Sequence, residues 1–253
     1  MSRRKQDVVS LLKTIERGGE GALQFVNPDR YIQHNLAIGE GVSGLAAALA
    51  QLPPGSARVN TVRVFEDGDY VFAHTDYDFF GPKIGFDIFR YEDGRIVEHW
   101  DNLQETPKGP NPGGHTMLDG PTEPADLDKT EENKALIRRQ IEDIIAGRLD
   151  RLPGYFDGDA YIQHNPLLAD GLSGLGAGLK ALAEKGVRVK YDRLHLVLGE
   201  GNFVLAVSEG IFGEAPSAYY DLYRIENGKI AEHWDVIEAI PPKEEQKNGN
   251  GKF

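Results

Sequence analysis

The feature that most constrains the fold of this chain is a segment that occurs twice. "YIQHN" begins at Tyr31 and again at Tyr161, and the longer segments "YIQHNLAIGEGVSGL" and "YIQHNPLLADGLSGL" are identical at nine of fifteen positions. A second pair, "RYEDGRIVEHWD" from Arg90 and "RIENGKIAEHWD" from Arg224, is identical at eight of twelve positions. Spacings of 130 and 134 residues exceed the roughly 20 to 50 residues of solenoid repeats. The sequence therefore predicts a tandem duplication of one domain.

Domain boundaries follow from the two copies and from what separates them. Residues 1–108 are predicted to form the first domain and residues 128–240 the second. Residues 109–127 are rich in Pro and Gly and too long for an ordinary loop, so we expect an interdomain linker there. The polar residues 241–253 are predicted to be a disordered tail.

Composition excludes several classes of protein. The net charge of -12 argues against a nucleic-acid partner or an anionic membrane, because both require clustered Lys and Arg. The chain has no Cys, which excludes disulfides, thiolate nucleophiles and Cys-ligated zinc. No apolar stretch is long enough to be a signal peptide or to span a membrane. We expect a cytoplasmic protein with no membrane association.

Periodicity predicts helices first and strands afterwards in each copy. Apolar residues keep helical spacing near the start of both copies, and a small helix is expected from Ser43 and from Ser173. Strand patterns follow, and the predicted fold class is α+β. The predicted strands are 58–65, 70–79, 83–91 and 95–104 in the first copy, and 187–198, 203–212, 218–225 and 229–237 in the second.

The last strand of each copy carries the first candidate catalytic residues. Alternate side chains of a strand share a face, so two sets are expected on opposite sides: Val97, His99 and Asp101 against Ile96, Glu98 and Trp100. "YEDGR" and "IENGK" resemble hairpins with a three-residue loop. That register places Asp87 opposite His99 and Asp221 opposite His233, whereas a two-residue turn would place Ile88 opposite His99. A carboxylate beside an imidazole suits a general base, although such pairs are as often solvated cross-strand pairs.

Other polar residues are predicted to converge on the same cavity. His34 and His164 lie in the short "YIQHN" strand, and we expect it to deliver one imidazole inward while Tyr and the amides fix the backbone. His74 adds a further candidate in the first copy, where the second copy has Val207. The predicted catalytic residues, with Asp235 as the counterpart of Asp101, are His34, His74, Asp87, His99, Asp101, His164, Asp221, His233 and Asp235.

Together these blocks resemble a known family. "YIQHN...DG.SGL" followed by "GKIAEHWD" is similar to the SnoaL-like polyketide cyclases of the nuclear-transport-factor-2-like superfamily, also called ketosteroid-isomerase-like. The resemblance implies two tandem cone-shaped α+β domains, each a curved, mostly antiparallel mixed sheet wrapped around N-terminal helices with a central cavity. It also implies an intramolecular pseudo-dimer, with further homo-oligomerisation left open.

The resemblance further implies a reaction class. Relatives use Asp or His for aldol cyclisation, isomerisation, dehydration or epoxide opening without a metal or organic cofactor. By position, Asp101 and Asp235 match the acid or base on the last strand, and His34 matches a pocket residue on the first. "AHTDY" lacks the Arg of the epoxide hydrolases, which disfavours epoxide opening.

The expected function is acid/base chemistry next to a carbonyl on a small hydrophobic ligand, with His99 and Asp101 both open as the base. Two alternatives stay open. One is a non-catalytic small-molecule-binding or interaction module, and the other is a metal site made from His34, His74, His99 and an Asp.

Overall fold

Each half of the chain begins with a helix whose apolar residues recur on one face. The computed structural model describes residues 1–253 and forms α1 from Arg3–Lys13 and α3 from Thr130–Ile145. The Ser2 side chain accepts a hydrogen bond from the Lys5 backbone N–H, which satisfies one free donor at the start of α1. Buried apolar residues at helical spacing are Val8, Leu11 and Leu12 in α1, and Ile137 and Ile141 in α3.

Each half then forms a five-stranded sheet, and the predicted α+β class is confirmed. The strand orders are β1-β5-β4-β3-β2 and β6-β10-β9-β8-β7. In each sheet the first, two-residue strand pairs parallel with the last strand, and all other pairs are antiparallel. The strands are β1 Ile32–Gln33, β2 Arg58–Asp67, β3 Tyr70–Asp78, β4 Pro82–Glu92, β5 Arg95–Glu105, β6 Ile162–Gln163, β7 Val189–Glu200, β8 Phe203–Phe212, β9 Ala215–Glu226 and β10 Lys229–Ala239.

A second helix follows each short strand. It spans Gly41–Leu49 as α2 and Gly171–Glu184 as α4, so both helices begin two residues before the expected Ser43 and Ser173. None of the helices is long and apolar enough to cross a membrane. The 3₁₀ helices are Thr14–Arg17, Ala22–Gln24, Leu127–Lys129, Leu149–Tyr155 and Lys243–Glu245.

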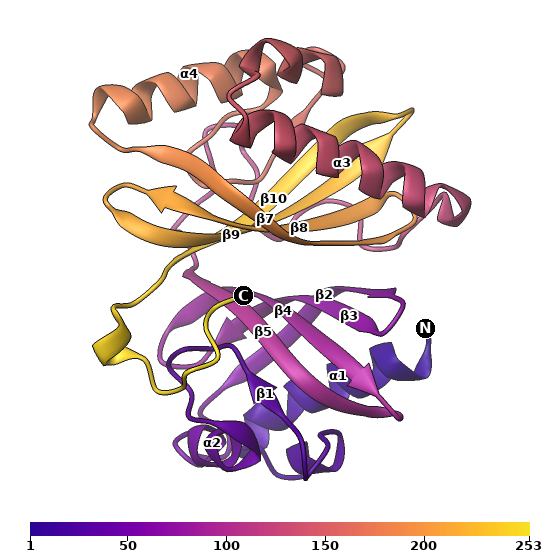
Figure 1. Ribbon diagram of the computed structural model, residues 1–253, viewed down its shortest axis with the longest axis vertical. Helices are drawn as coiled ribbons and strands as arrows, with labels where there is room; N and C mark the ends of the chain where they lie inside the picture. The colour runs from indigo at the N-terminus through magenta and orange to yellow at the C-terminus, as the bar shows by residue number, and fades with distance from the viewer. The chain divides into compact units, whose positions relative to one another are not determined.

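One face of each sheet packs against the long helix, and we call it the inner face. In Figure 1, α1 crosses this face of the first sheet, and α3 and α4 lie over it in the second. Its residues form the apolar cores: Val59, Val71, Ala73, Tyr77, Phe89, Tyr91 and Ile96 in the first sheet, and Val197, Val204, Ala206, Tyr223, Ile225 and Ile230 in the second.

The chain divides into two units whose boundaries differ from the predicted domains. The first unit comprises Met1–Thr106 together with Pro241–Phe253, and the second comprises Pro107–Ile240. The segment after the last strand of each half therefore belongs to the other half's unit. The expectation of a disordered tail is wrong, because residues 241–253 hydrogen-bond to the first unit. These bonds run from Lys247 N to Leu36 O, from Asn248 Nδ2 to Asn35 O and from Lys252 Nζ to Asp101 O.

The hairpin between β4 and β5 corrects the predicted register. Asp93 and Gly94 both have positive φ, 50° and 75°, which is typical of a two-residue turn rather than the three-residue loop expected. Glu92 therefore pairs with Arg95, and the pairing shifts between Arg90 and Tyr91. The second unit does the same with Asn227 and Gly228 at the turn.

The shift is a bulge at Val97, which pairs with no residue of β4. Ile96 consequently lies on the inner face with His99, and Val97 does not join it there, contrary to the simple alternation expected. His99 lies opposite Phe89, not Asp87, and Asp101 is the residue opposite Asp87. In the second unit His233 pairs with Tyr223, and Asp235 pairs with Asp221.

Candidate functional site

The first unit contains a cavity of about 350 Å³ on its inner face. Apolar residues of α1, α2 and the strands form most of its wall, and polar side chains gather where β1 meets β5. The lining polar and charged residues are Thr14, Tyr31, Gln33, Asn35, Gln51, Tyr77, Asp87, His99, Asp101 and Lys247.

His99 is held between a carboxylate and an amide. Its Nε2 lies 3.2 Å from Asp87 Oδ1, so the predicted pair forms across a diagonal of the ladder although the register was wrong. Its Nδ1 lies 2.9 Å from Gln33 Oε1, which also accepts from the Asn35 backbone N–H at 2.8 Å. A carbonyl oxygen only accepts, so Nδ1 carries a hydrogen and Nε2 shares a proton with Asp87.

Asp101 is held differently, with one oxygen engaged and the other free. Its Oδ2 accepts a 2.6 Å hydrogen bond from Asn35 Nδ2. Its Oδ1 is buried and has no hydrogen-bond partner. An unpaired buried carboxylate oxygen costs free energy, and Asp101 carries one while it lines the cavity.

Tyr31 completes the group with an available donor. Gln33 Nε2 donates to the Tyr31 hydroxyl at 3.2 Å, so the phenol oxygen accepts and its own hydrogen is uncommitted. Burial, with the charges of Asp101 and Asp87, raises the pKa of Tyr31 well above its ordinary value, which keeps the phenol protonated. A neutral hydroxyl that lines the cavity can donate to a ligand oxygen.

The second unit repeats this arrangement atom for atom. His233 lies 3.0 Å from both Gln163 Oε1 and Asp221 Oδ1. Asn165 Nδ2 donates to Asp235 Oδ2 at 2.7 Å, and Asp235 Oδ1 is again buried without a hydrogen-bond partner. One donor atom of each of three residues lies within 4.8 Å of the others in both groups, Asp87, His99 and Asp101, and Asp221, His233 and Asp235.

In both units a tyrosine hydroxyl donates a hydrogen bond to the aspartate beside the histidine, Asp87 or Asp221, but the tyrosine comes from different strands. Tyr77 on β3 donates to Asp87 Oδ2 at 2.8 Å, and Val59 is its partner on β2. In the second unit the corresponding pair is Tyr191 on β7 and Gly210 on β8, and Tyr191 donates to Asp221 at 3.1 Å. The same interaction is thus made with the tyrosine moved one strand across. Asp87 and Asp221 therefore both accept a hydrogen bond from a tyrosine hydroxyl.

Burial and neighbouring charges shift the pKa values of these groups. Burial raises the pKa of Asp87, against the opposing hydrogen bond to His99. Burial likewise raises the pKa of Asp235 to about 6, with Asp221 adding to the effect. Burial opposes the charged form of His233, but the hydrogen bond to Asp221 and the charges of Asp235 and Asp221 raise its pKa overall. Burial and the neighbouring charges therefore favour the protonated form of all three groups.

His34 does not line the cavity and His164 points away from the inner face of its sheet, so the expectation that these histidines point inward is wrong. Gln33 pairs with His99, so Tyr31, Gln33 and Asn35 point to the inner face and His34 points to the opposite face. There its ring stacks on Trp100 with centroids 4.7 Å apart, and its Nε2 lies 3.0 Å from Glu98 Oε1. The side chains of this segment that do line the cavity are those of Tyr31, Gln33 and Asn35.

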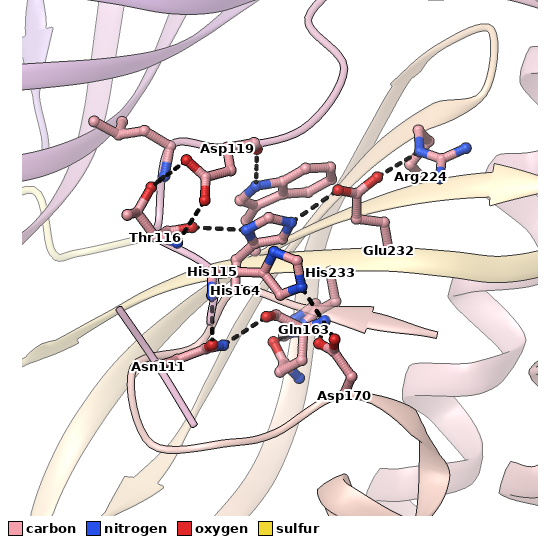
Figure 2. Close-up of polar contacts among 12 residues, drawn as sticks. Asn111, His115, Thr116, Asp119, Gln163, His164, Asp170, Arg224, Glu232 and His233 are labelled. Atoms are coloured by element: carbon pink, nitrogen blue, oxygen red, sulfur yellow. Dashed lines mark hydrogen bonds and ion pairs between the residues drawn. The ribbon is translucent and has the colours of Figure 1, made fainter. Parts of the chain in front are cut away.

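The same network surrounds His164 in the second unit (Figure 2). Its Nε2 lies 2.8 Å from Glu232 Oε1, and its Nδ1 lies 2.7 Å from the Thr116 carbonyl oxygen. The other oxygen of Glu232, Oε2, pairs with Arg224. In the first unit the Gly251 carbonyl takes this last place at 2.9 Å from His34 Nδ1. His34 therefore contacts the segment 241–253, and His164 contacts the segment 107–119.

His74 is also turned away from the cavity. It is buried on the face opposite α1, where its ring meets Phe86 edge to face at 4.6 Å and its Nδ1 lies 3.1 Å from Arg63 Nη1. Neither His34 nor His74 approaches His99 on the inner face, so the metal site proposed from these three histidines is not assembled. Asp87, His99, Asp101, Asp221, His233 and Asp235 are the predicted residues that the structure brings together.

Comparison with known proteins gives matches among solved structures alone. No protein-family model and no curated protein matches the chain. TsrD from Streptomyces laurentii is 20% identical, with a TM-score of 0.35 over 41% of this chain and 91% of its own. A putative ketosteroid isomerase from Kribbella flavida is 16% identical, with a TM-score of 0.36 over 45% and 84%. An NTF2-like protein of unknown function from Cytophaga hutchinsonii is 12% identical, with a TM-score of 0.35 over 41% and 92%.

Proposed function

We propose that the first unit is an enzyme of the aldol-type cyclase or isomerase class that removes a proton from carbon next to a carbonyl group. One observation carries the proposal: the buried Asp101 Oδ1 has no protein partner and belongs to a carboxylate that lines an apolar cavity beside an imidazole. A carboxylate oxygen that accepts no hydrogen bond from the protein is free to accept a proton from a ligand.

Asp101 fits the role of base better than His99 does. Both ring nitrogens of His99 are already engaged, by Gln33 and Asp87, whereas Asp101 has an oxygen free. His99 and Asp87 instead hold a shared proton next to Asp101, which offsets the build-up of negative charge. Asn35 fixes the carboxylate of Asp101 so that Oδ1 is the oxygen available to a ligand.

Tyr31 fits the role of the group that stabilises the enolate. When Asp101 takes the proton from carbon, the electron pair moves toward the carbonyl oxygen, and a preorganised hydroxyl donor lowers the energy of that charge. The proton then returns to another carbon in an isomerisation, or the enolate attacks a second carbonyl carbon in an aldol cyclisation. A small hydrophobic carbonyl compound is the ligand that this cavity suits.

Deuterium exchange tests this proposal without knowledge of the product. With β-tetralone in D₂O, the protein should accelerate exchange at the carbon next to the carbonyl, followed by NMR. Asp101→Asn should reduce the catalysed rate by about 10² or more, and Tyr31→Phe by about tenfold or more. Asp93→Asn is the matched control, because Asp93 is an exposed turn residue and Asn227 occupies its place in the second unit.

Two results would contradict the proposal. If Asp101→Asn and the control catalyse exchange equally fast, Asp101 is not the base. If the wild type catalyses no exchange with any of a panel of ketones, the result favours the non-catalytic binding module.

A metal site made by Asp87, His99 and Asp101 is the competing interpretation of the same geometry, because their donor atoms lie within 4.8 Å of one another. Stoichiometric metal in the purified protein, with activity lost to a chelator, would favour it.

A further inference from the structure

The C-terminal segment adds a cation to the cavity of the first unit. Lys247 lines the cavity and is exposed, and its Nζ makes no hydrogen bond or ion pair. The backbone around it is fixed, because Lys247 N donates to Leu36 O at 2.8 Å and Asn248 Nδ2 donates to Asn35 O at 2.8 Å and to Ile38 O at 2.9 Å. Lys247 is thus held beside the cavity and does not belong to a free tail.

The charged residues that line the cavity differ in their exposure to solvent. Asp87, His99 and Asp101 are all buried at the sheet, and Lys247 is the exposed member of the charged set. A ligand anion placed beside Asp101 would be repelled by its carboxylate and would lose its solvation. At Lys247 it would meet an opposite charge and keep contact with water. An acidic ligand therefore has one favourable orientation, with its acid at Lys247 and its neutral end at Asp101.

An aromatic side chain marks the exposed part of the lining. Phe80, in the turn between β3 and β4, lines the cavity, yet 75% of its surface is exposed. Its φ of 51° is unusual for a residue with a bulky side chain. Lys83 Nζ donates to the carbonyls of Phe79 and Phe80 and so fixes this turn. A large apolar surface held out in this way suits contact with the apolar body of a ligand.

We infer that the cavity of the first unit takes an apolar carbonyl compound that carries an acidic group, which Lys247 binds at the exposed end of the cavity. The inference rests on the proposed function, since it assigns the ligand class of the same site. It also gives the C-terminal segment a direct part in binding.

Two fluorescent probes test the acid separately from the apolar body. Anilinonaphthalene sulfonate is an anion, and N-phenylnaphthylamine is its neutral parent. Lys247→Gln should weaken binding of the sulfonate about two- to fivefold, as expected for an exposed ion pair, and leave binding of the neutral amine unchanged. Lys243→Gln is the matched control, because Lys243 lies in the same segment but does not line the cavity. Leu45→Trp, which fills the cavity, should abolish binding of both probes.

The outcomes separate the two proposals. If both probes bind and Lys247→Gln affects neither, or if Lys243→Gln weakens the sulfonate equally, the acid preference is wrong and the cavity still stands as a ligand site. If neither probe binds the wild type, or if both bind Leu45→Trp as before, the ligand assignment fails together with the proposed function.

Discussion

At the scale of residues, the candidate site of each unit is built around a histidine held between a carboxylate and a glutamine. The pairs of His99 with Asp87 and of His233 with Asp221 form as predicted, although the register does not. "YIQHN" was expected to deliver its histidine and instead delivers Tyr31, Gln33 and Asn35. The β1 strand has two residues, so its own pattern is too short to fix a face, and pairing with β5 decides it.

A signal for these residues was nevertheless present in the sequence. Tyr, Gln and Asn alternate in "YIQHN" with Ile and His, and side chains two apart in a strand share a face. Once one of the three is known to point inward, the other two follow. Tyr77 had no such signal, because the tyrosine that replaces it in the second unit lies on another strand.

The raised pKa of Asp235 predicts how stability depends on pH. The pKa of Asp235 is about 3.9 in the unfolded chain and about 6 in the folded one. Between these pH values the folded state therefore binds more protons than the unfolded state. Stability should therefore fall as pH rises through this window, by on the order of 3 kcal/mol. The raised pKa of His233 acts in the same direction at higher pH, because its favourable pairing is lost as the ring deprotonates.

Urea unfolding of the wild type and Asp235→Asn across this pH window measures the effect. The variant should be the more stable protein at neutral pH, because it lacks the buried unpaired carboxylate. Asp150→Asn, an exposed substitution in the same unit, is the control and should follow the wild type. Parallel pH profiles for the wild type and Asp235→Asn would contradict the prediction.

At the scale of elements, strands were predicted within a few residues and their pairing was less well determined. The alternation in "RIVEHWD" correctly predicted a strand where β5 lies, but the bulge at Val97 changed which of its residues face inward. A bulge depends on the turn and on both strands, and "YEDGR" is compatible with more than one turn. The asparagines of the tail gave no periodic pattern, and their partners are backbone carbonyls elsewhere in the chain.

Those asparagines supply the prediction at this scale. Asn248 and Asn250 donate to the carbonyls of residues 33, 35 and 38, next to the side chains that orient His99 and Asp101. Replacing both with Ala should destabilise the first unit by about 1 to 3 kcal/mol and expose the tail to proteolysis. Gln246→Ala is the control, because its side chain bonds to Pro241 within the same segment. An unchanged melting temperature and cleavage rate in the double variant would show that the tail is not anchored in this way.

At the scale of the whole molecule, the repeat predicted two similar halves but not the exchange of their end segments. Sequence identity marks what the two copies share, whereas residues 107–119 and 241–253 differ in sequence and make comparable contacts. Asn111 Nδ2 donates to the carbonyls of Gln163 and Asn165, as Asn250 and Asn248 do to those of Gln33 and Asn35.

This division predicts that the two halves behave differently as fragments. A fragment of residues 107–240 contains the whole second unit and should unfold cooperatively by itself. A fragment of residues 1–106 lacks its tail and should be less stable, and a synthetic peptide of residues 241–253 should raise its melting temperature. Calorimetry with and without the peptide measures this, with a scrambled peptide as control. A fragment 1–106 that melts identically in every case would disprove the dependence.

The return of residues 241–253 to the first unit also sets an order on biosynthesis. A ribosome makes the chain from its N-terminus, so β1 to β5 emerge long before Lys247, and the entire second unit is translated in between. The lining of the first unit's cavity is therefore completed only after the whole second unit has been made. A nascent chain that stops short of the tail has this cavity without Lys247, so a ligand whose binding required that lysine would report that translation had reached the segment.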